Sequence, residues 1–458
     1  QQHRPVKEQS EAVGHAVRAT YLYAAMADVG ALTDDKGYTR ALNRIWSNIT
    51  DKKMHITGGL GAVHGIEGFG SNYELPNKDA FNETCAAVGN VMFNHRMFLL
   101  TKDAKYLDVA EVALLNNVLA AVNFEGNKFF YVNPLSADGK YPFNHGTAGR
   151  APWFGTACCP SNMARLIPQV PGMTYAQDQH NLFVTFYAES STEISMADTK
   201  VRVEQKTAYP NKGLISVNIH PAKPVKFSLY LRIPTWAQGN QFLPGDLYDF
   251  VDSIAKPVSL KVNGEYIDVK NLQNGFAVIK REWIAGDKVE LNLPMPIQKN
   301  RCHTAVKANV DRIALTRGPF VMCAEGIDNG GVTQRYFLDE NMDISKTKIA
   351  MKNLKHGSFI QANVPANRLT NIQGDSSFSQ LSLIPYYAWN NRNTSSMTVW
   401  FPTKTEMAIY DPLALPSESV FKEIKASHTA PEDSVNAIGD GRVDKWSSGN
   451  KVARWTSR

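Results

Sequence analysis

Apolar residues change their spacing about 175 residues into this chain of 458. Before that point they recur at helical spacing over about 9–29, 36–50, 80–101 and 103–122, with a short helical piece after Pro160. From Leu182 onward apolar and polar residues alternate, as expected for half-buried strands, and Asn263-Gly264 marks a tight turn between two short strands. The pattern predicts helices over 1–175 and an antiparallel β-sandwich region, in two modules, over 176–415.

The last stretch, 416–458, is polar but contains Trp446 and Trp455. Two tryptophans are unusual in a linker, so we expect a linker followed by the start of a further β-sandwich module. A disordered tail is the alternative.

Composition excludes several classes of protein. The net charge of +6 is spread along the chain, which argues against nucleic-acid binding. No run of about 18 apolar residues predicts a membrane span. Five scattered cysteines do not form a disulfide framework. The chain opens on polar residues without Met, so we expect that any signal peptide was removed or never present, with a periplasmic, secreted or cytoplasmic location.

Three of the five cysteines fall in two short motifs, Glu83-Thr84-Cys85 and Cys158-Cys159. Three thiols and one carboxylate can complete a tetrahedral zinc site. The alternative is that cysteine is a small buried hydrophobe, because Cys85 lies on an apolar helical stripe and no CxxC pair is present.

Local geometry limits how these side chains can meet. Side chains two apart on a helix point to different sides, so Glu83 and Cys85 can share an ion only at a helix start, which we expect between Asp79 and Asn82. There the helix dipole favours a thiolate. Cys159 precedes a proline and is biased toward extended backbone, so Cys158 and Cys159 can bind one ion only if the chain bends.

A glycine-rich loop over 58–70 is too long for a simple connection, which suggests a functional loop. It is not a phosphate-binding fingerprint, because His64 stands where a third glycine belongs and no strand precedes it. Glu67 on this loop has apolar neighbours and is a candidate proton donor. A solvated surface carboxylate is the alternative, and Glu74 and Asp79 are competing acids.

At five ordered blocks the chain resembles glycoside hydrolase family 127, the β-L-arabinofuranosidase family, over roughly residues 9–415. The blocks are His55-Ile56-Thr57-Gly58-Gly59, Asn72-Tyr73-Glu74-Leu75-Pro76-Asn77, Glu83-Thr84-Cys85-Ala86, Phe129-Phe130-Tyr131-Val132-Asn133-Pro134-Leu135, and Trp153-Phe154-Gly155 through Cys158-Cys159-Pro160-Ser161-Asn162.

The resemblance implies an (α/α)6 barrel followed by β-sandwich modules, with zinc (Zn²⁺) held by Glu83, Cys85, Cys158 and Cys159. It also implies that Cys158 is the nucleophile and Glu67 the general acid/base. His15 and Tyr131 resemble sugar-contacting residues of the family.

With only about five helices before the β region, the chain resembles the C-terminal half of such a barrel. We therefore expect a longer natural protein and exposed apolar helix faces. These faces would associate with the missing half or with a second copy.

Three functions follow as expectations. The first is a retaining exo-glycosidase that acts on terminal β-L-arabinofuranosides of plant-type glycans, or on a related rare sugar. The second is a non-catalytic carbohydrate-binding protein with structural zinc. The third is a hydrolase that uses Glu67 with Glu74. Tyr131 and Trp153 suit all three as sugar-stacking or core aromatics, and we expect Cys302 and Cys323 to be packing residues.

Overall fold

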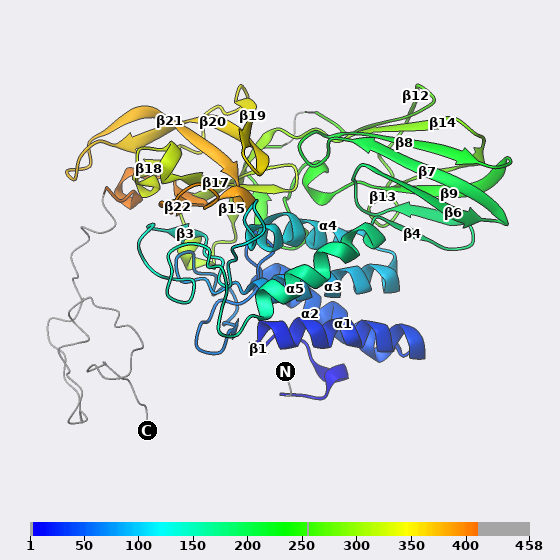
Figure 1. The fold of residues 1–458 in the computed structure, drawn as a ribbon, viewed down its shortest axis with the longest axis horizontal. Coiled ribbons are helices and arrows are strands. Elements are labelled where there is room, and N and C mark those ends of the chain that lie inside the picture. Colours follow the sequence, from blue (N-terminus) through cyan, green and yellow to red (C-terminus); the bar gives the residue numbers. More distant parts are fainter. Residues whose placement is uncertain (1–2, 254–255, 411–458) are drawn as a thin grey trace.

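The structure, a computed structural model, describes residues 3–253 and 256–410. The module predicted over 416–458 lies outside this part of the chain. The described residues arrange as a block of helices covered on one side by two β regions (Figure 1). Within them, no helix has the length and apolar content needed to cross a membrane.

The helical region contains five α-helices among the described residues, as the apolar spacing predicts. They are α1 (Ala16–Thr33), α2 (Lys36–Lys52), α3 (Thr84–Thr101), α4 (Ala104–Val112) and α5 (Cys158–Leu166). A complete (α/α)6 barrel needs more helices than these, so the barrel stays a prediction.

Several helix bounds differ from the predicted ones. Helix α1 begins seven residues later than expected, because Gly14 has a left-handed φ of 75° and forms, with His15, the strand β1 (Gly14–His15). Helix α3 begins at Thr84, after Asn82 adopts a φ of 41°. The helix predicted over 103–122 changes to a π-helical turn, Ala113–Val118, after α4.

Helix α3 lies at the centre of the helical region. Its residues from Thr84 to Val91 are all buried, and it packs against α1, α4 and α5. A Cβ on Gly89 would meet Thr20 Oγ1 at 2.1 Å, so this glycine permits the close approach of α3 to α1.

The first β region is built from two sheets, and Asn263-Gly264 forms the predicted turn with left-handed φ at both residues. Its strand pairs are antiparallel except β5 with β9, which run parallel and so depart from the prediction. The strands are β4 (Tyr175–Gln177), β5 (Asn181–Val184), β6 (Ser190–Met196), β7 (Thr199–Thr207), β8 (Leu214–Pro221), β9 (Val225–Arg232), β11 (Ser259–Val262), β12 (Glu265–Ile267), β13 (Phe276–Trp283) and β14 (Asp287–Asn292).

The second β region is a single antiparallel sheet that also takes in a two-residue strand from the helical region. Its strands are β3 (Ser136–Ala137), β10 (Tyr248–Phe250), β15 (Ile297–Cys302), β16 (Arg312–Arg317), β17 (Phe320–Glu325), β18 (Tyr336–Phe337), β19 (Lys348–Leu354), β20 (Gly357–Leu369), β21 (Ser376–Pro385), β22 (Met397–Thr398) and β23 (Trp400–Pro402). The division of 176–415 into two modules remains a prediction.

A buried ion cluster fixes α4 to the first β region. Arg232 on β9 donates to Asp108 at 2.7 Å and to Glu111 at 2.5 Å, and the hydroxyl of Tyr209 donates to Glu111 at 2.7 Å. The three charged side chains are almost completely buried. Around them one continuous hydrophobic core joins the helices to both β regions.

Some apolar side chains on the helices lie exposed. Val29 and Leu32 on α1 and Leu99 on α3 are 40%, 87% and 48% exposed.

Candidate active site and metal centre

Three helix N-termini supply the side chains of the site. His15 caps α1, Glu83 caps α3, and Cys158 is the first residue of α5. The positive end of a helix dipole favours a negative charge, so all three positions suit anionic groups. Glu83 precedes α3 and is not helical, so its side chain and that of Cys85 reach the same point. Two residues this close in sequence can meet in this way only at the start of a helix.

The cysteine pair is helical and not extended, which corrects the expectation drawn from Pro160. The proline is the third residue of α5, where the absence of its N–H costs no helical hydrogen bond. The chain bends just before the pair, at Ala157, which has φ −91° and ψ 43°. Both sulfurs can therefore turn toward the start of α3.

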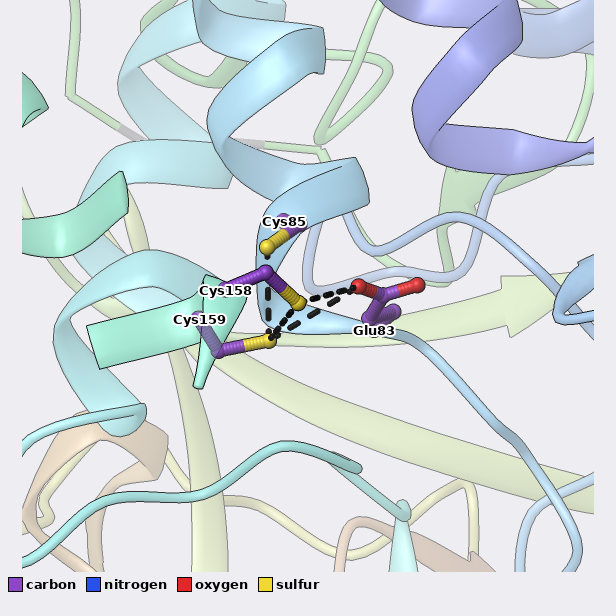
Figure 2. A group of neighbouring side chains, drawn as sticks. All are labelled: Glu83, Cys85, Cys158 and Cys159. Carbon is purple, nitrogen blue, oxygen red and sulfur yellow. Dashed lines mark hydrogen bonds between the residues drawn. The ribbon is translucent and has the colours of Figure 1, made fainter. Parts of the chain in front are cut away.

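The four predicted metal ligands meet in the fold (Figure 2). Sγ of Cys85 lies 3.4 Å from Sγ of Cys159, and the two adjacent sulfurs are 4.0 Å apart. Oε1 of Glu83 is 3.6 Å from Sγ of Cys158 and 3.7 Å from Sγ of Cys159. All four ligand atoms lie within 4.8 Å of one another.

Burial and the charges of neighbouring groups shift the pKa values in this cluster. Burial raises the pKa of Glu83 to about 8, and negative charges on Cys158 and Glu67 add to the effect. Hydrogen bonds from Cys159 and Cys85 hold the pKa of Cys158 well below its usual range. The pKa of Cys159 is raised by burial, and that of Cys85 by its hydrogen bond with Cys158. One negative charge therefore collects on Cys158, the only partly exposed sulfur of the three.

The donor set fits a zinc ion. Zinc with bonds of about 2.3 Å to sulfur in a tetrahedron holds its sulfurs about 3.8 Å apart, close to the separations here. In addition, Oε2 of Glu83 is buried and has no hydrogen-bond partner. A carboxylate buried in this way gains a compensating charge from a bound cation. Asn162 donates to Cys85 Sγ at 3.0 Å and orients that ligand.

The glycine-rich loop brings Glu67 to the cluster. Strand β2 (Gly68–Phe69) pairs with β1, and this places Glu67 beside His15, whose Nε2 lies 3.1 Å from Oε2 of Glu67. Glu67 has a left-handed φ of 49°, a strained conformation for a residue with a side chain. His15, Glu67 and Glu83 form a second group whose polar atoms lie within 4.8 Å of one another.

Tyr131 contacts the exposed sulfur. Its hydroxyl oxygen lies 3.3 Å from Cys158 Sγ, and because burial raises the pKa of the hydroxyl, it keeps its proton and donates to Cys158 when that sulfur is a thiolate. The backbone carbonyl of Tyr131 accepts from Thr84 N at 3.0 Å, which ties this segment to the start of α3. The predicted sugar-contacting Tyr131 thus lies against the predicted nucleophile.

Other predicted residues lie farther from the cluster. Trp153 is 61% exposed, and its ring packs edge-on against Phe129 with centroids 6.5 Å apart. Its neighbour Phe154 is the one that packs against Tyr131, at 5.5 Å. Glu74 is used within its own loop, where Oε2 accepts from Ser71 N at 2.7 Å.

The sequence did not predict two further residues near the site. Burial raises the pKa of Tyr21 on α1, and negative charges on Cys85, Cys158 and Glu83 raise it further, so Tyr21 lies within electrostatic range of the cluster. His145 packs edge-on against Tyr131, with ring centroids 4.4 Å apart. Neither residue belongs to a spacing pattern, but the left-handed φ of 48° at His145 marks an unusual position.

Comparison with known proteins places this geometry in a family. Residues 1–172 match the profile of the β-L-arabinofuranosidase GH127 catalytic domain. Residues 181–295 match the GH127 middle domain, and residues 297–402 match the glycoside hydrolase family 127 C-terminal domain.

Individual relatives agree with the domain matches. A non-reducing end β-L-arabinofuranosidase of Bifidobacterium longum subsp. longum is 32% identical over 417 residues, which are 86% of this chain and 60% of that protein. A solved GH127 β-arabinofuranosidase superposes with a TM-score of 0.84 at 42% identity, over 89% of this chain and 63% of that one.

The GH127 β-L-arabinofuranosidase of Geobacillus stearothermophilus T6 superposes with a TM-score of 0.80 at 35% identity, over 88% of this chain and 63% of that one. The chain thus spans less than two thirds of the length of these relatives.

A helical region that carries a site of one glutamate and three cysteines is followed by two β regions, in the order of the three matched domains. The chain belongs to glycoside hydrolase family 127.

Proposed function

We propose that this chain carries the catalytic site of a retaining exo-glycosidase that removes terminal β-L-arabinofuranose from plant-type glycans. The observation that carries the proposal is the position of Cys158. It is the partly exposed sulfur of the cluster, it is stabilised as a thiolate, and Tyr131 and Glu83 contact it. The names of the relatives support the sugar.

Glu83, Cys85, Cys158 and Cys159 would hold the zinc ion. When bound, zinc keeps thiols deprotonated near neutral pH. The ligand set brings three thiolates and one carboxylate to a dication, a formal charge of −2. This excess of negative charge makes the exposed Cys158 sulfur electron-rich and therefore nucleophilic.

In the first step the thiolate of Cys158 attacks the anomeric carbon of the sugar. The bond from that carbon to the leaving oxygen breaks, and the carboxylic acid of Glu67 gives its proton to this oxygen. The product on the protein is a thioglycoside at Cys158. The hydroxyl of Tyr131, which donates to Cys158 Sγ, orients the sulfur for the attack.

In the second step a water molecule replaces the leaving group. The carboxylate of Glu67 takes a proton from this water, the resulting oxygen attacks the anomeric carbon, and the carbon–sulfur bond breaks. Cys158 returns as a thiolate and Glu67 as an acid. His15, 3.1 Å from Glu67, holds the carboxyl group in place through both steps.

Sugar binding would use residues around the two reacting groups. Imidazole and phenol groups donate hydrogen bonds to hydroxyls, so His15 and Tyr131 suit the terminal sugar. The exposed Trp153 offers an aromatic face to a sugar ring.

We also propose that the five helices are part of an (α/α)6 barrel and that the protein acts in the periplasm or outside the cell. The other helices of such a barrel or a second copy would cover the exposed side chains on α1 and α3. The share of the relatives that the chain spans supports the barrel proposal.

Covalent labelling tests the proposal. We expect a cyclophellitol-type β-L-arabinofuranose probe to add once to the protein, at Cys158, in a sample that holds one zinc per chain. Cys158→Ser should abolish the adduct and turnover, whereas Cys302→Ser, which removes a thiol outside the site, should retain both. Intact-mass spectrometry, peptide mapping and a zinc assay give the readouts.

Two other results of these experiments would contradict the proposal. Turnover that survives Cys158→Ser would indicate a pair of carboxylates. Arabinofuranoside binding without turnover in the unmodified chain would indicate a carbohydrate-binding protein with structural zinc.

A further inference from the structure

We propose that a cavity next to the glycine-rich loop binds the part of the glycan that leaves, meaning the sugars on the far side of the scissile bond. This leaving-group cavity has a volume of about 690 Å³, within the usual range for ligand sites. Its walls come from the glycine-rich loop, the segment 71–79 and a loop of the second β region. The lining residues used below are His64, Asn72, Tyr73, Asp79, Ala305 and Lys307.

The lining residue His64 belongs to the same turn as the proposed proton donor, Glu67. Val63 and Gly68 exchange backbone hydrogen bonds at 3.1 and 3.0 Å, and Glu67 N donates to His64 O at 3.1 Å. His64 and Glu67 therefore stand at the two ends of one tight turn. Because Glu67 gives its proton to the leaving oxygen, the group attached to this oxygen must lie beside this turn.

A chain of ring contacts leads from the cavity to the nucleophile. The His64 ring packs edge-on against Phe81 at 4.9 Å between centroids, and Phe81 lies 6.1 Å from the ring of Tyr131. The hydroxyl of Tyr131 in turn donates to Cys158 Sγ. The lining residue His64 is thus linked through Phe81 to Tyr131, at the position where the terminal sugar would react.

The segment 71–79 is fixed to the second β region by contacts across the chain. Tyr73 has a left-handed φ of 67°, and its ring stacks on His303 at 4.8 Å with an interplanar angle of 16°. Asn77 Nδ2 donates to Asn309 Oδ1 at 2.8 Å. A strained aromatic residue held in this way is pre-organised, as expected of a binding wall.

The lining suits a neutral, hydroxyl-rich ligand. Asp79 accepts hydrogen bonds, Lys307 donates them, and Asn72 does both, while Tyr73 adds an aromatic ring. Donors, acceptors and charges of both signs stand side by side. Carbohydrate hydroxyls match this mixture, and the ring of Tyr73 can contact a sugar face.

The inference rests on the proposed function, and its test separates the two. Ala305→Trp adds a large side chain at a position that lines the cavity, and Thr304→Trp adds the same side chain at an exposed neighbour outside the cavity. We compare kcat/KM for a β-L-arabinofuranosyl disaccharide with kcat/KM for methyl β-L-arabinofuranoside. The ratio should fall about tenfold or more in Ala305→Trp and stay within about twofold in Thr304→Trp.

A binding measurement keeps the inference testable if no turnover is seen. In the Cys158→Ser background, calorimetric titration with the disaccharide should show binding that Ala305→Trp weakens at least about tenfold and Thr304→Trp does not. Unchanged affinity and an unchanged kcat/KM ratio in Ala305→Trp would overturn the inference, as would a lack of any disaccharide binding. If Ala305→Trp weakens disaccharide binding in a chain that shows no turnover, the role of the cavity in glycan binding stands. Only the hydrolase function is then rejected.

Discussion

Single buried side chains hold the backbone on which the site is built. Asn144 accepts from the amides of Tyr131 and Val132 at 2.8 and 3.4 Å, and it donates to carbonyls of Phe129 and Gly149 at 3.2 and 2.9 Å. One amide side chain thus fixes the segment that carries Tyr131. At this scale the fold depends on complete hydrogen bonding, because an unpaired buried polar group costs about 1–3 kcal/mol.

His55 supports the glycine-rich loop and makes its stability pH-dependent. Nε2 donates to Pro76 O at 3.1 Å, whereas Nδ1 is buried without a partner, so burial lowers the pKa of His55 to about 4. The folded state therefore binds fewer protons than the unfolded state, in which the pKa of histidine is about 6.5. The stability from the neutral ring is present above pH 6.5 and is lost as the pH falls through 4.

We expect His55→Gln to flatten this dependence. Between pH 6.5 and 4 the unmodified chain should lose up to about 3 kcal/mol more stability than the variant. Urea denaturation at a series of pH values measures the difference, and the exposed His180→Gln should keep the slope of the unmodified chain. Equal slopes for His55→Gln and the unmodified chain would contradict the expectation.

At the scale of elements, very short pieces of structure place the reactive groups. Strands β1 and β2 pair over only two residues each, yet this pairing sets Glu67 beside His15. Similarly, the entry of Cys158 and Cys159 into α5 lets their sulfurs meet Cys85. Such elements contribute little stability, so their effect should appear in activity before it appears in unfolding.

Gly68→Ala tests the importance of the β1–β2 contact. A Cβ at Gly68 would lie 2.3 Å from Gly14 O, so the strands must separate and Glu67 must move. Because a misplacement of about 1 Å can cost about 100-fold, kcat/KM for 4-nitrophenyl β-L-arabinofuranoside should fall by about that factor.

Gly65→Ala is the matched control for this variant. It adds the same methyl group on the same loop, with no atom within 4 Å. It should keep its activity, and equal activities of the two variants would show that the contact is dispensable.

At the scale of the whole molecule, the helical region and the first β region share one core and one buried ion cluster. Arg232 stands in this cluster between Asp108 and Glu111, with its guanidinium fully buried. Buried charges tolerate the loss of a partner poorly, because the remaining charge cannot be solvated. The orientation of the site relative to the β regions thus depends on a contact far from the chemistry.

We expect Arg232→Met to lower the free energy of unfolding by about 3–5 kcal/mol, because two buried carboxylates lose their counter-charge. Urea denaturation followed by circular dichroism measures the change. Arg202→Met removes an exposed arginine that pairs with Glu204 at 3.7 Å, and it should cost less than about 1 kcal/mol. A similar small loss for both variants would show that the buried cluster is not needed for stability.

The sequence by itself determined the division into helices and strands, the Asn263-Gly264 turn and the identities of the clustered side chains. These features depend on local periodicity and on the chemistry of short motifs, which neighbouring residues carry. Only the tertiary structure decided that α3 begins at Thr84, that α5 starts at the cysteine pair, that β5 and β9 run parallel, and that Tyr21 and His145 join the site. Each of these depends on contacts between residues far apart in the chain, such as Cys85 with Cys159, and local sequence preferences cannot specify them.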